Sequence, residues 1–389
     1  MSTKPRLLWV GDACVSSGFA RATHRTLNTL KETFDVSVLG MNYHGDPHEY
    51  PYPIYPCSPG GDYFGLGRLT GLIAKTGPSV IVVQNDPWNF QPYIERAGNV
   101  PVVGLVAVDG KNCQGTQLNG LSLAIFWTKF GEEQAKLGGY TGPSTVVPLG
   151  VDLEVYSPQD REALREKTLA KVFANRGLPK DTFVIGVVGR NQQRKRLDLT
   201  MEYFAHWIKT SRVSDAVLWL HVAPTGDQAY DLRQLGDYYR ISNRVITPTI
   251  EERHGLTEKA LSQAYNFFDV MATTTQGEGF GLPCLEGMAC GVPQIVPDWS
   301  ALGEWTKEAA WKVLCTTFAV TPNGINVLGG IADKDLFVQA LDGLYHDKAL
   351  RASFAQAGLT LSAESQFRWD NIGRAVGAAI EQALYGVTA

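Results

Sequence analysis

Short apolar runs alternate with longer amphipathic stretches along this chain, and this alternation constrains the fold more than any other feature. In the first part of the chain, the runs typical of buried strands are residues 7–10, 36–39, 80–83, 102–106, 124–127 and 145–147. After a charged stretch at 160–180, a second set follows at 183–188, 217–222, 244–247, 268–272 and 294–296. Helix-length segments separate these runs, and parallel strands require such crossover connections. The pattern predicts an α/β chain with two Rossmann-like parallel-sheet domains.

The length of 389 residues agrees with two domains, because single domains seldom exceed roughly 250 to 300 residues. We expect an N-terminal domain at 1–150, a linker with a first helix at 151–180, and a C-terminal domain at 181–369. The last segment, 370–389, is amphipathic and long enough for a helix that crosses back. Ligands of open α/β sheets bind beyond the carboxyl ends of the strands, so two facing sheets would share one cleft.

Composition predicts no metal centre and no overall attraction to polyanions. The formal net charge is −4, which leaves DNA binding or peripheral membrane contact to local basic patches. The six cysteines lack C-x-x-C pairs and histidine partners at zinc-site spacing, which fits reduced thiols in the cytoplasm. The N-terminus has no signal-peptide pattern, and no run of about 18 apolar residues occurs. We therefore expect a cytoplasmic chain without a transmembrane segment.

The segment 273–298 carries the strongest functional pattern. A buried strand is followed by a turn containing Gly277, Gly279 and Gly281, and then by a helix with a proline in its first turn. Free amides at such a helix start can hold a phosphate group. Glu278 lies in the turn, and Glu286 is expected in the first helical turn, where the helix dipole favours a carboxylate whatever its function. The segment therefore indicates an anionic nucleotide ligand.

Three motifs in this order resemble the retaining glycosyltransferases of family 4. The first is the E-x7-E pair within EGFGL, followed by a G-x-P turn at 291–293. The second, at 184–199, has a strand, then Gly-Arg, then a lysine five residues beyond the arginine. The third, at 146–158, resembles the interdomain strand and linker of that family. The N-terminal half is similar more loosely, and resembles members from phage and archaeal genomes.

This resemblance implies a GT-B fold, in which the two domains face each other across a cleft and the C-terminal helix returns to the N-terminal domain. It implies a hexosyltransferase that retains anomeric configuration, with a UDP-sugar as the first expected donor and a GDP-sugar next. No cofactor or metal is expected beyond this donor. No residue is an evident covalent nucleophile, so retention is expected through same-face attack within a short-lived ion pair.

The resemblance also assigns roles to residues. Arg190 and Lys195 would stabilise the departing diphosphate, because nearby cations offset its growing charge. Glu286 would bind the ribose and Glu278 the donor sugar. The expected donor-binding residues are Gly18, Arg190, Lys195, Glu278, Gly279, Phe280, Gly281, Leu282 and Glu286. The expected catalytic residues are Arg190, Lys195, Glu278 and Asp109. By itself the run RNQQRKR suggests a solvated loop, and we keep that interpretation for Arg194 and Arg196.

The residue that orients the acceptor is less constrained. Asp109 follows the strand at 102–106 and is our candidate, with Asp86 as the rival. Many family members carry a histidine at such a position, but this chain has Asn-Asp-Pro and Val-Asp there, so no histidine role is transferred. Three further residues are either sugar or acceptor contacts or parts of a capped helix start: Ser300, Ala301 and Glu304.

Other functions remain as alternatives at this stage. A dinucleotide site is rejected, because the glycines of GEGFG are spaced one residue short of the fingerprint. The acceptor could be a glycan, a lipid or a protein, or a hydroxymethylated pyrimidine in phage DNA, which would place the protein in the host cytoplasm. A sugar phosphorylase, an epimerase and a catalytically silent nucleotide-sugar-binding module are the remaining alternatives.

Overall fold

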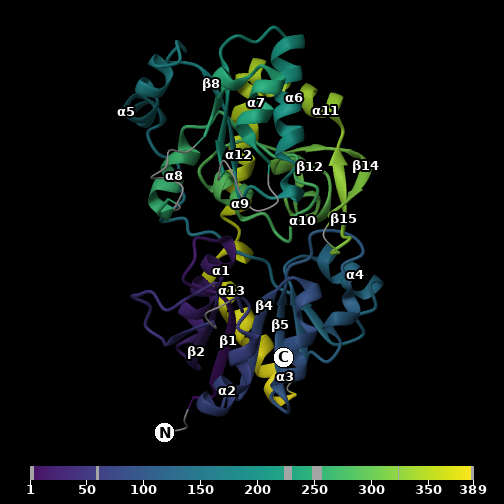
Figure 1. Cartoon of the computed structure of the whole chain (residues 1–389). Helices are drawn as coiled ribbons and strands as arrows, with labels where there is room; N and C mark the ends of the chain where they lie inside the picture. The colour runs from purple at the N-terminus through teal and green to yellow at the C-terminus, as the bar shows by residue number, and fades with distance from the viewer. Residues whose placement is uncertain (1–3, 58–60, 223–229, 248–255, 323, 387–389) are drawn as a thin grey trace. The chain divides into compact units, whose positions relative to one another are not determined.

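The computed structural model describes residues 4–57, 61–222, 230–247, 256–322 and 324–386 (Figure 1). The chain forms two compact units. Unit 1 comprises Met1–Gly150, Gly324–Val327 and Ser365–Ala389, and unit 2 comprises Val151–Asn323 and Leu328–Glu364.

Within the described residues, unit 1 contains a seven-stranded sheet in the order β3-β2-β1-β4-β5-β6-β7, and all its strand pairs are parallel. Its strands are β1 (Arg6–Asp12), β2 (Asp35–Met41), β3 (Ile54–Pro56), β4 (Val80–Asn85), β5 (Val102–Val106), β6 (Leu123–Phe126) and β7 (Ser144–Val146). Its α-helices are α1 (Gly18–Leu30), α2 (Leu66–Thr76), α3 (Gln91–Ala97), α4 (Lys129–Leu137) and α13 (Trp369–Tyr385). Its described 3₁₀ helices are η1 (Pro87–Asn89), η2 (Gly115–Leu118) and η7 (Ser365–Phe367).

The first sheet is apolar on both faces because each face is covered. Side chains alternate along a strand, so Leu7 and Trp9 of β1 enter one core cluster, while Leu8 and Val10 enter another. The first cluster includes residues of α1 and α13, and the second includes residues of α2 and α3. This arrangement explains why the strands of unit 1 have continuous apolar sequences.

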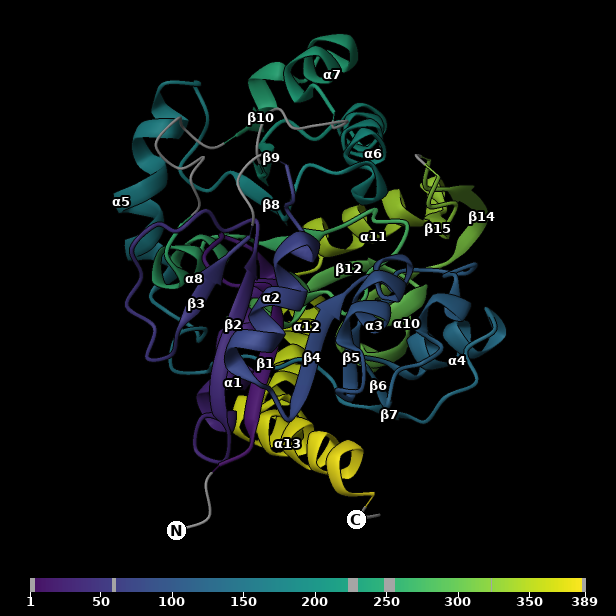
Figure 2. The ribbon, with the colours of Figure 1, turned by 60° about the horizontal axis from the view of Figure 1, so that its bottom comes forward.

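Helix α13 packs against α1, and both views place the two helices side by side (Figures 1 and 2). The contact is close because α13 presents glycine to its partner. A Cβ added at Gly373 would lie 2.4 Å from Cβ of Thr29. Ile372, Val376 and Ile380 of α13 are buried in the core of unit 1. The predicted return of the C-terminal helix to the N-terminal domain is confirmed.

The larger sheet of unit 2 has six parallel strands among the residues described, in the order β10-β9-β8-β11-β12-β13. These strands are β8 (Phe183–Val188), β9 (Ala216–His221), β10 (Val245–Ile246), β11 (Val270–Ala272), β12 (Gln294–Pro297) and β13 (Trp311–Val313). A separate antiparallel pair consists of β14 (Cys315–Val320) and β15 (Leu328–Ala332).

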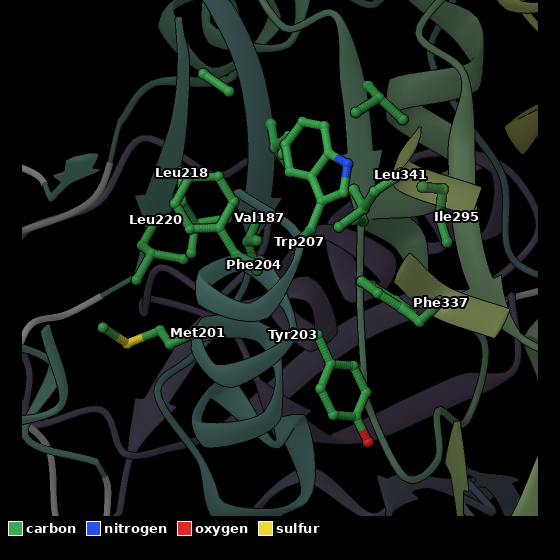
Figure 3. Packing of buried hydrophobic residues seen from close by; sticks show 14 of the residues in the cluster. Val187, Met201, Tyr203, Phe204, Trp207, Leu218, Leu220, Ile295, Phe337 and Leu341 are labelled. Atoms are coloured by element: carbon green, nitrogen blue, oxygen red, sulfur yellow. The ribbon is translucent and has the colours of Figure 1, made fainter. Parts of the chain in front are cut away.

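Most helices of unit 2 that the structure describes follow one of its parallel strands, as the βαβ pattern predicts. They are α5 (Arg161–Ala174), α6 (Leu197–Thr210), α7 (Leu232–Tyr239), α8 (Glu258–Asn266), α9 (Leu282–Ala289), α10 (Ser300–Trp305), α11 (Lys334–His346) and α12 (Lys348–Ser362). The 3₁₀ helices η3 (Gln193–Lys195), η4 (Ser242–Arg244) and η6 (Lys307–Ala309) lie between them. In the core, Trp207 and Phe204 of α6 pack with strand residues such as Leu218 and with Phe337 of α11 (Figure 3).

The fold class predicted from the sequence is confirmed, since each unit contains a Rossmann-like parallel sheet. Four strands were not predicted: β3, β13, β14 and β15. The first two contain three residues each, too few for a periodic signal, and β14 is largely exposed. No helix within the described parts of the chain is long and apolar enough to cross a membrane.

Candidate functional site

Two loops of unit 2 lie side by side at the carboxyl edge of the sheet. Strands β8 and β11 are neighbours, so the loop 189–196 after β8 meets the loop 273–281 after β11. The Gln276 amide donates to the Arg194 carbonyl at 2.8 Å, and the Thr274 hydroxyl donates to the Arg196 carbonyl at 2.7 Å. These bonds join two segments that are distant in sequence into one surface.

The charged centre of this surface is the Glu278 cluster, which consists of Glu278, Lys195 and Arg194. Lys195 forms an ion pair with Oε1 of Glu278, and Arg194 Nη1 donates to Oε2 at 3.0 Å. Glu278 is only 8% exposed. Burial alone raises the pKa of its carboxyl, but the charges and hydrogen bonds of Lys195 and Arg194 outweigh burial and hold that pKa at about 2. Glu278 is therefore ionised at neutral pH.

Main-chain contacts fix the position of Glu278 further. Its backbone amide donates to the Ser300 hydroxyl at 3.1 Å, and Arg194 Nη1 also donates to the Gly277 carbonyl at 2.7 Å. Ser300 is the first residue of α10 and has a φ of 50°. Of the three residues considered in this segment, Ser300 thus supports Glu278 directly. Ala301 is fully buried, and Glu304 lies further along α10.

A pocket opens beside the cluster and encloses about 490 Å³, open solvent included. Four residues expected from the sequence line it: Arg190, Lys195, Glu278 and Gly281. The rest of the wall is formed by Val187, Val188, Gly189, Leu197, Val222, Met271, Ala272, Thr273, Pro283, Cys284, Gln294 and Leu302. Arg190 is exposed, and its guanidinium bonds to no residue of the described chain. The pocket therefore brings cations from one loop to the glycine turn of the other.

The glycine turn has a conformation that requires glycine at one position. Gly281 has a φ of 92°, and a Cβ there would lie 2.6 Å from Cδ2 of Leu302. Phe280 points into the protein, where it stacks on Trp305 with ring centroids 5.2 Å apart. Gly279 and Leu282 are buried. The Phe280 ring is therefore buried against Trp305, whose Nε1 donates to the Phe280 carbonyl at 2.7 Å, and Phe280 is absent from the pocket wall.

Glu286 does not lie where the sequence placed it within its helix. Helix α9 begins at Leu282, because Gly281 takes a left-handed conformation at the cap. Glu286 is consequently its fifth residue, and the expected position in the first helical turn is wrong. Its side chain is 3% exposed, and Oε2 accepts a hydrogen bond from the Tyr265 hydroxyl of α8 at 2.7 Å.

The remaining predicted residues belong to unit 1. Gly18 is the first residue of α1, directly after the N-cap Ser17. The Ser17 hydroxyl accepts from the Ala20 amide at 3.0 Å and donates to Asp12 at 2.7 Å. Asp109 is half-buried and lies three residues beyond β5, and Asp86 directly follows β4. All of them follow strands of the first sheet at its carboxyl edge.

Arg194 is the residue that sequence reasoning missed. We expected a solvated side chain, but its guanidinium bonds to Glu278 and Gly277. The partner is 84 positions away in sequence, so no local pattern could reveal the contact. Arg196 pairs with Asp198, two residues further on. Among the side chains that the structure describes, no group of three or more His, Cys, Asp or Glu residues could hold a metal ion.

Residues 170–359, which contain both loops, match the sequence model of the family described as Glycosyl transferases group 1. Residues 170–359, a little under half of the chain, therefore resemble a group 1 glycosyltransferase domain. A D-inositol 3-phosphate glycosyltransferase of Stackebrandtia nassauensis is 30% identical over 244 residues, which is 61% of this chain and 49% of the relative. This chain spans about half the length of that relative. A protein of the same name from Geodermatophilus obscurus is 32% identical over 176 residues, which is 36% of its length.

Solved structures resemble the whole chain in fold. Sucrose-phosphate synthase from Thermosynechococcus elongatus superposes with a TM-score of 0.74 at 16% identity, covering 99% of this chain and 100% of that protein. HepE from Anabaena, solved with UDP-glucose, gives a TM-score of 0.72 at 15% identity, covering 97% and 99%. The predicted resemblance to glycosyltransferases is supported by the family model over residues 170–359, and the solved structures support the predicted fold. The alternative of a phage-type DNA glycosyltransferase gains no support from these relatives.

Proposed function

We propose that the chain transfers a hexose from a nucleotide-diphosphate sugar to an acceptor hydroxyl with retained anomeric configuration. The observation that supports this most is the pocket of the group 1 domain, whose wall combines Arg190 and Lys195 with the glycine turn at Gly281. Such a wall suits a diphosphate, which needs cations and free amides.

The charge of the site favours a leaving group with two negative charges. Arg190, Arg194 and Lys195 carry three positive charges, and ionised Glu278 removes one, which leaves two. At about 4 Å and an effective dielectric constant near 20, one cation and one phosphate attract each other by about 4 kcal/mol before desolvation. Cations fixed in advance stabilise the diphosphate as its charge develops, without reorganising at that moment.

In the proposed complex, Arg190 and Lys195 bind the diphosphate together with amides near Gly281 and Leu282. Glu278 accepts hydrogen bonds from hydroxyls of the donor sugar, and Glu286 binds the ribose. Asp109 orients the acceptor hydroxyl, and the backbone near Gly18 approaches the diphosphate. The proton of the acceptor leaves with the diphosphate, since same-face attack brings both groups to one side of the anomeric carbon.

The names of similar proteins order the substrates to be tested. HepE was solved with UDP-glucose, and another similar structure, from E. coli, was solved with UDP-2-fluoro glucose. We therefore place UDP-sugars first and GDP-sugars next. The names of similar proteins also refer to inositol 3-phosphate, sucrose phosphate and trehalose 6-phosphate. Small polyols and sugars, with and without phosphate, are therefore the first acceptors to test.

The test measures nucleotide release from UDP-, GDP-, ADP- and dTDP-sugars, with and without these acceptors. We expect one donor to react, with release stimulated by an acceptor, and the product to retain the anomeric configuration by NMR. Lys195→Met should lower kcat/KM about 100-fold, by analogy with loss of one preorganised charge-stabilising donor. Arg233→Met, which removes an exposed cation of α7 in the same unit, is the matched control.

Three results would contradict the proposal. Donor binding without turnover in any mixture would identify a silent binding module. Release that requires inorganic phosphate would identify a phosphorylase. Equal effects of Lys195→Met and Arg233→Met would show that the pocket is not the donor site.

A further inference from the structure

Glu278 has two cationic partners that differ in their relation to the pocket. Lys195 lines the pocket, so its ammonium can meet a ligand there. Arg194 is absent from the pocket wall, and its Nη1 atom bonds both to Glu278 and to the Gly277 carbonyl. The Arg194 carbonyl also accepts from the Gln276 amide at 2.8 Å. Arg194 is therefore anchored to the glycine turn itself, while Lys195 approaches Glu278 from the pocket.

A bound diphosphate would change this arrangement. Its oxygens would compete with Glu278 for the three N–H donors of the Lys195 ammonium, and this competition weakens the bond between Lys195 and Glu278. Glu278 is 8% exposed, so a carboxylate left without its partner would be a buried, uncompensated charge. It would then take up a proton and lose its capacity to accept hydrogen bonds from the sugar at two oxygens.

We propose that Arg194 is a positioning residue that keeps Glu278 charged and oriented while Lys195 turns to the diphosphate of the donor. This inference rests on the proposed function and extends it to a residue for which neither the motifs nor the comparisons give a role. In this arrangement Glu278 needs two cationic partners, because Arg194 alone remains bonded to it throughout the reaction.

The other groups near Glu278 cannot replace Arg194. Cys284 of α9 faces the carboxylate, but burial and the Glu278 charge raise the pKa of its thiol, which therefore stays neutral. Ser300 of α10 accepts a bond from the Glu278 amide and contributes no charge. Arg190 lines the same pocket but is not bonded to Glu278. The Glu278 charge thus depends on Lys195 and Arg194.

A purely structural role for Arg194 makes a different prediction, so the two can be separated. An arginine that only clamps the loops would, when replaced, lower stability and activity equally at every pH. An arginine that holds Glu278 ionised would, when replaced, cause a loss of activity that grows as pH falls, because the folded-state pKa of Glu278 in the donor complex would rise.

The experiment compares Arg194→Gln, Arg194→Lys, Glu278→Gln and the double variant Arg194→Gln/Glu278→Gln. Arg196→Gln is the matched control, because it removes the same charge from the same loop but its guanidinium pairs with Asp198. The kcat/KM for nucleotide release is measured from pH 5 to 8.5, and urea unfolding reports the stability of each variant. Calorimetry of UDP binding in buffers of different ionisation enthalpy counts the protons taken up.

We expect Arg194→Gln to lower kcat/KM about tenfold at pH 7.5, as for loss of a hydrogen bond to a charged group. On the acid side of its pH profile, kcat/KM should begin to fall at least about one pH unit above the pH at which that of the wild type falls. UDP binding to this variant should also take up protons. Arg194→Lys should restore the wild-type pH profile, and Arg196→Gln should leave that profile unchanged. The double variant should be no less active than Glu278→Gln alone, since Arg194 acts through Glu278.

The inference is overturned if Arg194→Gln keeps the wild-type pH profile or if its effect adds fully to that of Glu278→Gln. Both results would leave the proposed function intact. If the wild-type chain binds and hydrolyses no nucleotide sugar, the proposed function fails first and this inference falls with it.

Discussion

At the scale of single residues, the charge of Glu278 depends on partners from a different loop. The carboxyl is buried, which by itself favours the protonated form, yet two cations hold its pKa at about 2. A glutamate in the unfolded chain has a pKa of about 4.3. Because the folded pKa is lower, this group stabilises the fold above about pH 4.3, and the contribution is lost as pH falls toward 2.

Replacing Glu278 with glutamine should flatten the acid dependence of stability. Between pH 5 and pH 3 the free energy of unfolding of the wild type should fall by about 1.5 kcal/mol more than that of Glu278→Gln. Urea unfolding at pH 5, 4 and 3 measures this difference. Glu162→Gln removes one exposed carboxylate of unit 2 and controls for net charge. Parallel curves for the wild type and Glu278→Gln would contradict the ionised state described above.

Gly281 combines a left-handed backbone with a crowded position, so Gly281→Ala should be costly. Backbone strain and the contact with Leu302 should together lower the free energy of unfolding by about 2 to 4 kcal/mol. Gly177→Ala is the matched control, because Gly177 has a φ of 65° with no atom within 4 Å of the added Cβ. That variant should lose about 1 kcal/mol from backbone strain alone. If urea unfolding gave the same loss of unfolding free energy for both variants, the Leu302 side chain would be able to move away from the added Cβ at no energetic cost.

At the scale of elements, the parallel order of the strands positions the site. The motifs that carry Lys195 and Glu278 each follow a strand, and the pairing of β8 with β11 places the two loops next to each other. A helix begins at the end of each loop: α6 follows the first loop, and α9 follows the second. Neither loop contains the Glu278 cluster by itself.

The packing of α13 on α1 also depends on one small residue. Gly373→Leu should push the helices apart and lower the stability of unit 1 by about 2 kcal/mol, because overpacking of a filled interface costs about 1 to 3 kcal/mol. Ala378→Leu adds a similar side chain at an exposed position of the same helix and should be nearly neutral. Hydrogen exchange of peptides from α1 and β1 measures the effect. Equal protection in both variants would contradict the close approach of the helices.

At the scale of the whole molecule, unit 1 is assembled from segments at opposite ends of the chain. Residues 365–389 supply α13, whose apolar face completes the core around β1 and α1. Unit 2 has its own core, centred on α6, α11 and the strands between them. The two units should therefore respond differently to loss of the C-terminus.

Deletion of residues 365–389 should unfold unit 1 and leave unit 2 folded. Buried residues of α13, such as Ile372 and Ile380, would no longer cover the first sheet. Hydrogen exchange should show loss of protection in peptides spanning β1 and β4, while peptides spanning β8 and β9 keep theirs. Protection of β1 in the shortened chain, or equal loss in β8, would contradict this division.

The sequence by itself determined the βαβ rhythm, the two sheets, the C-terminal helix and the loops that carry the candidate donor residues. These features follow from local rules: apolar runs fix the strands, and glycine or proline fixes the turns that follow them. The motif spacing also placed Arg190, Lys195, Glu278 and Gly281 after strands, where the pocket is found. Each of these features depends on residues that are close together in sequence, so one segment of the chain is enough to predict it.

The tertiary structure alone decided which of these residues touch. Glu278 pairs with Lys195 and Arg194 across 83 and 84 positions, and that pairing exists only because β11 joins the sheet beside β8. The depth of Glu286 and its bond to Tyr265 follow from the left-handed cap at Gly281 and from the packing of α8 on α9. Contacts of this kind arise from strand order and helix packing, which the spacing of residues along one segment does not contain.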